Sequence, residues 1–165
     1  MPEQRSAATL GPDEGAAVRA RGDVYICKAA AAQTEGHYSL FEARHAPGGG
    51  VPPHRHSLDE ESFYILEGRY RFWVGEESLE LGPGDFAHVP RPSPHAFENV
   101  GETTARMLIV IAPGGYHERY FEEAWQPVAD LRRPPAPEPP DFERIAAAAS
   151  RAGIELLPGG ARTAG

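Results

Sequence analysis

Short runs of apolar or alternating residues fill most of the chain between Val24 and about Phe121. Turn-forming residues, chiefly glycine, proline and asparagine, separate these runs at intervals of about 8 to 12 residues, the spacing of strands in β-sandwiches and barrels. Alternating apolar and polar side chains are typical of a strand that buries one face. The pattern predicts strands at residues 24–29, 37–45, 62–66, 70–74, 86–89 and 105–111. We therefore expect an all-β sandwich or barrel.

A helical pattern occurs only near the C-terminal end. The segment RRPPAPEPP (132–140) predicts a stiff linker, because proline cannot continue the interior of a strand or helix. After the linker, Asp141 is suited to cap the start of a helix and Gly153 to end it. The apolar face of this helix is expected to consist of Phe142, Ile145 and Ala149. The sequence thus predicts one short C-terminal helix.

These boundaries divide the chain into one domain and its extensions. A length of 165 residues is sufficient for one hydrophobic core. We expect a flexible N-terminal tail at 1–12, a β-barrel at 13–131, a proline-rich linker at 132–140, a helix at 141–153 and a C-terminal tail at 154–165.

The charge balance excludes several classes of partner. The net charge is −8 and Lys28 is the only lysine, so the basic surface that binds nucleic acid is missing. No apolar stretch reaches the roughly eighteen residues that cross a membrane, and the first residues do not resemble a signal peptide. We expect no nucleic-acid or membrane partner and a cytoplasmic protein. Abundant arginine, alanine, glycine and proline suggest a GC-rich bacterial coding sequence.

The segment GGGVPPHRHSLDEESFYILEG (48–68) carries the first candidate chemistry. Residues two apart share one face of a strand, so His54 and His56 present both imidazoles to the same side. In the following strand, Glu61 heads a row that continues with Phe63 and Ile65. Two imidazoles and one carboxylate oxygen can therefore converge on one metal ion.

A second block, GDFAHVPRPSPHAFEN (84–99), supplies a third imidazole. His95 follows the stiff Pro-Arg-Pro-Ser-Pro turn, so it loses little entropy when it binds a metal. Three imidazoles and one carboxylate, without thiolate, suit one divalent transition metal: Fe(II), Mn(II), Ni(II), Cu(II) or Zn(II). Four protein ligands leave coordination positions open, which favours catalysis over a structural role.

Both blocks resemble the two motifs of the cupin superfamily. The first has Gly48, His54, His56, Glu61 and Gly68 at the family spacing. The second has its matching positions at Gly84, Pro90, His95 and Asn99, with Pro92 in place of the family glycine. The resemblance covers roughly residues 13 to 125 and implies an antiparallel jelly-roll β-barrel, with His54, His56, Glu61 and His95 as metal ligands.

Further segments are similar to small bacterial cupins grouped with quercetin 2,3-dioxygenase, among them VPRPSPHAFENVG and PGGYHERYF. This resemblance implies a metal-dependent dioxygenase that cleaves an electron-rich enol or phenol, with dioxygen as co-substrate. Glu61 would act both as ligand and as catalytic proton acceptor. Alternatives are a non-redox isomerase, cyclase or lyase acting on a polyketide or sugar-like molecule, and a binding module without turnover. The family resemblance also implies a homodimer.

Other residues near the motifs have competing interpretations. The three histidines could form hydrogen bonds only, as in cupins that have lost their metal, and Glu60 competes with Glu61 as the carboxylate ligand. Asp59 and Glu60 are interpreted as solvated turn charges, and His37, His45 and His117 as surface or rim residues. Aromatic strand residues are first of all core. The candidates for lining a substrate pocket are Phe63, Phe72, His88 and Phe97.

Overall fold

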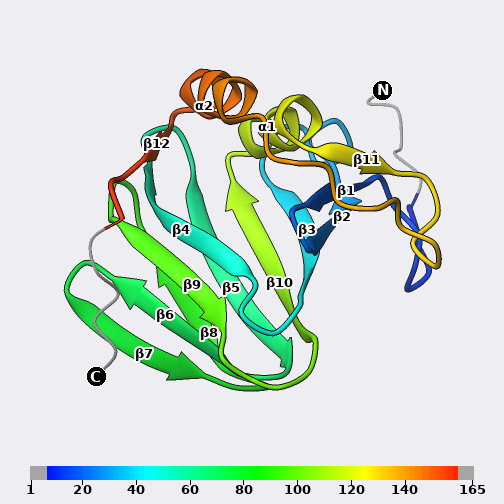
Figure 1. Cartoon of the computed structure of the whole chain (residues 1–165). Helices are drawn as coiled ribbons and strands as arrows, with labels where there is room; N and C mark the ends of the chain where they lie inside the picture. The colour runs from blue at the N-terminus through cyan, green and yellow to red at the C-terminus, as the bar shows by residue number, and fades with distance from the viewer. Residues whose placement is uncertain (1–6, 160–165) are drawn as a thin grey trace.

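The computed structural model describes residues 7–159, whose strands form two antiparallel sheets (Figure 1). In spatial order, the larger sheet contains β11 (Gln126–Val128), β1 (Ala17–Ala20), β2 (Asp23–Ala29), β3 (Ser39–His45), β10 (Ala105–Ala112), β5 (Glu60–Glu67) and β8 (Phe86–Val89). The smaller sheet contains β12 (Ile154–Leu156), β4 (Gly50–His56), β9 (His95–Asn99), β6 (Tyr70–Val74) and β7 (Glu77–Leu81). The predicted all-β jelly-roll fold is confirmed.

The core lies between the two sheets because strand alternation turns one apolar row of each strand inward. Phe63 of the larger sheet packs against Phe72 and Phe97 of the smaller one, with ring centroids 5.1 and 5.6 Å away. Phe63 and Phe72 are fully buried. Aromatic rings thus fill the barrel interior below the end at which the candidate site lies.

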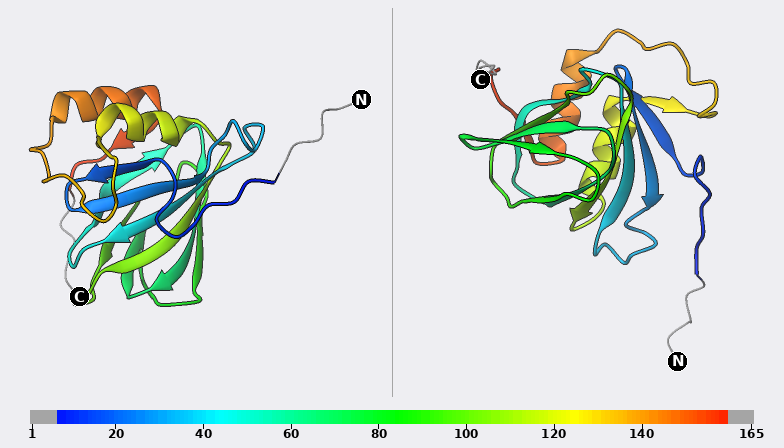
Figure 2. Two further views of the ribbon diagram at one scale, coloured as in Figure 1. Left: turned by 90° about the vertical axis from the view of Figure 1, so that its right-hand side faces the viewer. Right: turned by 90° about the horizontal axis from the view of Figure 1, so that it is seen from below.

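Two helices cover that end of the barrel (Figures 1 and 2). α1 (Tyr116–Ala124) directly follows β10, and α2 (Phe142–Arg151) packs against it through Ala124, Ile145 and Ala148. The sequence analysis missed α1. Its buried positions are His117, Phe121 and Ala124, so the stripe is short and begins with a residue that counts as polar. None of the helices within residues 7–159 is both long and apolar enough to cross a bilayer.

The C-terminal helix begins at its expected cap, since the Asp141 side chain accepts a hydrogen bond from the Arg144 backbone at 3.0 Å. Its buried face, however, consists of Ile145, Ala148 and Ala149. Phe142 was wrongly assigned to that face and is 70% exposed. It occupies the first helical position, where most of the side chain remains in contact with solvent.

The segment after α2 is also different from the predicted tail. β12 pairs with β4, placing Ile154 opposite His56 and Leu156 opposite His54. Gly153 makes this pairing possible: its φ is +70°, and a Cβ there would lie 2.6 Å from a Leu58 side-chain atom. Three residues expected to be a tail therefore extend the sheet beside two candidate ligands.

His45 corrects another expectation, because it is fully buried rather than at the rim. Its Nε2 lies 3.1 Å from the Tyr25 hydroxyl and its Nδ1 lies 2.7 Å from the Tyr70 hydroxyl. A neutral imidazole satisfies both tyrosines by donating one hydrogen bond and accepting the other. Burial lowers the pKa of His45 from 6.5 to about 3.

This depressed pKa predicts a specific acid sensitivity of folding. Between pH 6.5 and about 3 the unfolded state binds the His45 proton and the folded state does not, so stability falls as the pH falls. One such proton is worth about 1.4 kcal/mol per pH unit. Urea denaturation between pH 6 and 4 measures this effect. As the pH falls, the unfolding free energy of wild type should decrease more steeply than that of His45→Gln, by about 1.4 kcal/mol per pH unit. Parallel slopes for the two proteins would contradict a neutral, buried His45.

Candidate metal centre

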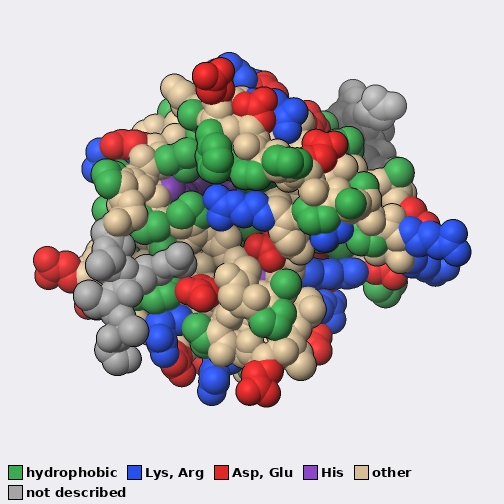
Figure 3. Space-filling model, viewed as in Figure 1, with side chains coloured by type: hydrophobic (Ala, Val, Ile, Leu, Met, Phe, Trp, Pro, Cys, Tyr) green, Lys and Arg blue, Asp and Glu red, His purple; other side chains and the backbone are tan. Residues whose placement is uncertain are grey.

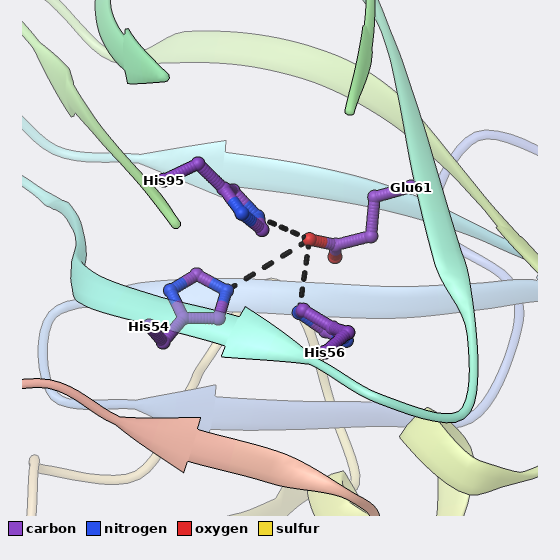
Figure 4. A group of neighbouring side chains, drawn as sticks. All are labelled: His54, His56, Glu61 and His95. Atoms are coloured by element: carbon purple, nitrogen blue, oxygen red, sulfur yellow. Dashed lines mark hydrogen bonds and ion pairs between the residues drawn. The ribbon is translucent and has the colours of Figure 1, made fainter. Parts of the chain in front are cut away.

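The four side chains expected to bind a metal meet in one buried cluster (Figure 4). His54 and His56 lie on the inward face of β4, and His95 opens the neighbouring strand β9 directly opposite His54. Glu61 comes from β5 in the other sheet. Both sheets therefore contribute to the cluster, and strand register fixes each backbone.

A single oxygen lies at the centre of the cluster. Glu61 Oε2 is 2.7 Å from His95 Nε2, 3.1 Å from His56 Nε2 and 3.8 Å from His54 Nε2. The three imidazole ring centroids are 4.3 to 5.5 Å apart. All four residues are at most 7% exposed, so water competes little for these atoms.

The outer nitrogen of each imidazole is held by an acceptor. His54 Nδ1 donates to the Pro52 carbonyl at 2.9 Å, and His95 Nδ1 donates to the Ser93 carbonyl at 3.0 Å. His56 Nδ1 donates to Asp59 Oδ1 at 2.6 Å. With the proton on Nδ1, the neutral form of each imidazole directs its Nε2 lone pair at the centre.

This arrangement fits a metal ion better than a network of hydrogen bonds. His56 Nε2 is buried and has no hydrogen-bond partner among the described residues. Three inward lone pairs and one carboxylate oxygen are a nitrogen-rich donor set that suits a divalent transition metal. The cluster can therefore hold one such ion.

The charge states agree with that fit. Burial opposes ionisation of Glu61, but the His56 charge and the close approach of all three imidazole Nε2 atoms outweigh it and hold the pKa of Glu61 well below its usual value. Burial lowers the pKa of His54, which favours the neutral imidazole. At His56, burial is outweighed by Glu61 and Asp59, and the pKa rises to about 10. The carboxylates therefore attract positive charge, which a metal cation can supply in place of that proton.

Two residues that the sequence analysis placed outside the site lie beside it. Asp59 is fully buried rather than solvated, and His117 of α1 is 7% exposed rather than on the surface. The His117 ring stacks on His56 with centroids 5.2 Å apart, and its Nε2 lies 3.9 Å from Glu61 Oε1. Asp59, three residues after His56 in the turn, offered a weak local signal. Nothing in the sequence placed His117 here.

An apolar cavity of about 270 Å³ opens beside the cluster. His54, Glu61 and His117 line it, together with Phe97 and residues of both helices and β12. Figure 3 shows histidine side chains in a hollow below the helices. The cavity can therefore bring a small molecule directly to the candidate metal ligands.

The expected pocket residues divide into three groups. Phe97 lines the cavity, whereas Phe63 and Phe72 are core residues that do not. His88 lies on the outer face, where it is exposed and its Nδ1 is 2.9 Å from Ser62 Oγ. The reason is register: Glu61 pairs with Val89 and points inward, so the next pair, Ser62 and His88, points outward.

Comparison with known proteins identifies a family model and a solved structure that are similar to this chain. A family model described as "Cupin domain" matches residues 41–111. A predicted oxalate decarboxylase from Thermotoga maritima has a similar fold, with a TM-score of 0.53 and 23% identity, over 55% of this chain and 80% of that one. Residues 41–111 thus match the domain of the cupin superfamily, and this fold and the buried three-histidine, one-glutamate cluster agree with that match.

Within this superfamily the chain is similar to quercetin 2,3-dioxygenase of Bacillus subtilis, with 28% identity over 127 residues. The match spans 77% of this chain but only 37% of that relative. A second relative, polyketide synthase CurC of Streptomyces cyaneus, is 33% identical over 67 residues, which are 41% of this chain and 44% of that protein. The chain thus spans less than half the length of either relative.

Proposed function

We propose that this protein is a metal-dependent dioxygenase that oxidatively cleaves an electron-rich enol or phenol. One observation carries the proposal: the three-histidine, one-glutamate cluster opens through His54 and Glu61 onto an apolar cavity lined by aromatic residues. A cavity of this kind suits a flat organic molecule. The similarity to quercetin 2,3-dioxygenase supports the same chemistry.

In this proposal, His54, His56, His95 and Glu61 hold one divalent transition metal. When bound, such an ion supplies Lewis acidity and access to dioxygen chemistry. Glu61 has a second role, because it lines the cavity and its Oε1 is directed towards His117 rather than towards the three imidazoles. That oxygen accepts the proton of the substrate hydroxyl. The apolar walls orient the ring and exclude water.

The test is oxygen uptake by the metal-loaded protein with a panel of phenols and enols. We expect oxygen consumption matched by loss of the substrate's ring absorption, and Glu61→Gln should reduce the rate by about 100-fold or more if Glu61 is the proton acceptor. Product formation without oxygen uptake would contradict a dioxygenase.

A second candidate function, a non-redox isomerisation or cyclisation of a polyketide-like molecule, is favoured by the similarity to polyketide synthase CurC. It predicts substrate turnover at the same rate under argon as in air. A homodimer and a cytoplasmic location, both expected from the sequence, remain predictions that sedimentation and cell fractionation can test.

A further inference from the structure

The cavity has one feature that the proposed reaction does not require. Arg21 is the only lysine or arginine among its lining residues. It lies in the turn between β1 and β2, on a different element from any candidate metal ligand. We infer that Arg21 binds an anionic group of the substrate, so that the substrate is an aromatic hydroxy acid. This inference rests on the proposed function, since it assumes that the hydroxyl end faces the metal ligands.

The charge of Arg21 acts on the Asp23 carboxylate two residues away, and Glu138 and Asp141 share a small surface pocket with Arg21. Within residues 7–159, its guanidinium forms no ion pair with a carboxylate, including the two carboxylates that share the cavity lining. Asp23 instead accepts hydrogen bonds from the Ala46 and Gly50 backbones at 3.2 and 3.0 Å. Glu61 is surrounded by the three imidazoles. An unpaired arginine at the opening of an apolar cavity is suited to recruit a carboxylate, which it can bind through two hydrogen bonds.

The backbone keeps Arg21 at this position despite a conformational cost. Ala20 pairs with Asp23, so Arg21 and Gly22 form a tight two-residue turn. Arg21 has φ of +60°, a left-handed conformation that glycine or asparagine adopts more easily. Its carbonyl also accepts a hydrogen bond from Arg19 Nε at 3.1 Å. Two-residue hairpin turns require a positive φ at their first central residue, so the turn geometry fixes the point from which the Arg21 side chain extends.

The surroundings of Arg21 indicate what the rest of the ligand is. Tyr120, Trp125 and Phe142 line the same cavity, and Phe142 is 70% exposed at the start of α2. Figure 3 shows a basic side chain across the hollow below the helices, with histidines behind it. A ligand that satisfies both ends has an aromatic body, a hydroxyl directed at Glu61 and a carboxylate directed at Arg21. This distinguishes it from a neutral polyphenol.

The test compares two probes that differ only in the carboxylate, 6-hydroxy-2-naphthoate and 2-naphthol. Their binding to the metal-loaded protein is measured calorimetrically without oxygen. Wild type should prefer the acid, and Arg21→Gln should weaken acid binding by about tenfold or more while changing naphthol binding by less than about twofold. Retained naphthol binding also shows that the variant is folded. Arg21→Lys, which keeps the charge but not the two-pronged geometry, should lose an intermediate amount of affinity.

Arg132→Gln is the matched control, because it removes the same charge from an exposed position that lines no described cavity. It should leave both affinities within about twofold of wild type, since solvent and salt screen a distant charge. Equal losses for the two probes in Arg21→Gln, a wild-type preference for naphthol, or no binding of either probe would overturn the inference. An absence of oxygen uptake with every phenol would instead contradict the proposed function, and the probe preference would still report on Arg21.

Discussion

Replacing His54 with alanine is expected to reduce the metal content of the purified protein from about one ion per chain to a small fraction of that. His54 is buried, its Nδ1 is held by Pro52, and its Nε2 is directed at Glu61, so the substitution removes one of the four donors of the cluster. Elemental analysis after dialysis measures the loss. A chelator should also lower the melting temperature of wild type but not of the variant, because a ligand that binds only the folded state stabilises it.

His37→Ala is the matched control for this experiment. His37 is an exposed histidine outside the buried cluster, so the variant should keep the wild-type metal content and the chelator effect. His117→Ala would be an unsuitable control, because His117 stacks on His56. Full metal content in His54→Ala would refute the assignment of His54 as a ligand. A folded wild-type protein that never binds a transition metal would refute the metal centre as a whole.

Asp59→Asn is expected to weaken metal binding by about 10- to 100-fold, although Asp59 is not a candidate ligand in the main cluster. The Asp59 carboxylate accepts a 2.6 Å hydrogen bond from His56 Nδ1, which directs Nε2 inward and, in the neutral imidazole that binds a metal, leaves Nε2 as the free ligand atom. An amide is a weaker acceptor and can present its NH₂ group to the same nitrogen, which reverses the tautomer preference. Competition with a chromophoric chelator gives the affinity directly.

The adjacent Glu60 provides the control, since its side chain is 38% exposed and faces His88 and Arg91 on the outer surface. Glu60→Gln removes the same charge one residue away and should leave metal affinity within about twofold of wild type, because exposed pairs contribute little. If both variants lost affinity equally, the effect would be general electrostatics rather than orientation of His56.

The adjacent residues Asp59 and Glu60 differ in burial in a way that the sequence does not predict. Both were predicted to be solvated turn charges, and local pattern does not separate them. The structure buries Asp59 completely and leaves Glu60 partly exposed. The difference arises because the turn after β4 folds back towards His56, and α1, from a distant part of the chain, covers Asp59 with His117.

The sequence by itself determined the features that depend on short-range geometry. Strand alternation placed His54 and His56 on one face and Glu61 at the head of an inward row, and N-cap preference placed Asp141 at the start of α2. These relations hold because neighbouring residues on a strand or helix have fixed relative directions. The same alternation predicted the β-fold and its aromatic core.

Only the tertiary structure decided what surrounds the cluster. It brought His117 from α1, paired β12 with β4, buried His45 between two tyrosines and turned His88 outward through strand register. It also placed Arg21 at the same cavity as Glu61. Each of these contacts joins segments far apart in the chain, and packing selects them through the total burial of apolar surface. The total burial of apolar surface cannot be read from the spacing of neighbouring residues. The candidate ligands could therefore be predicted from the sequence, whereas the residues that line the cavity could be identified only from the fold.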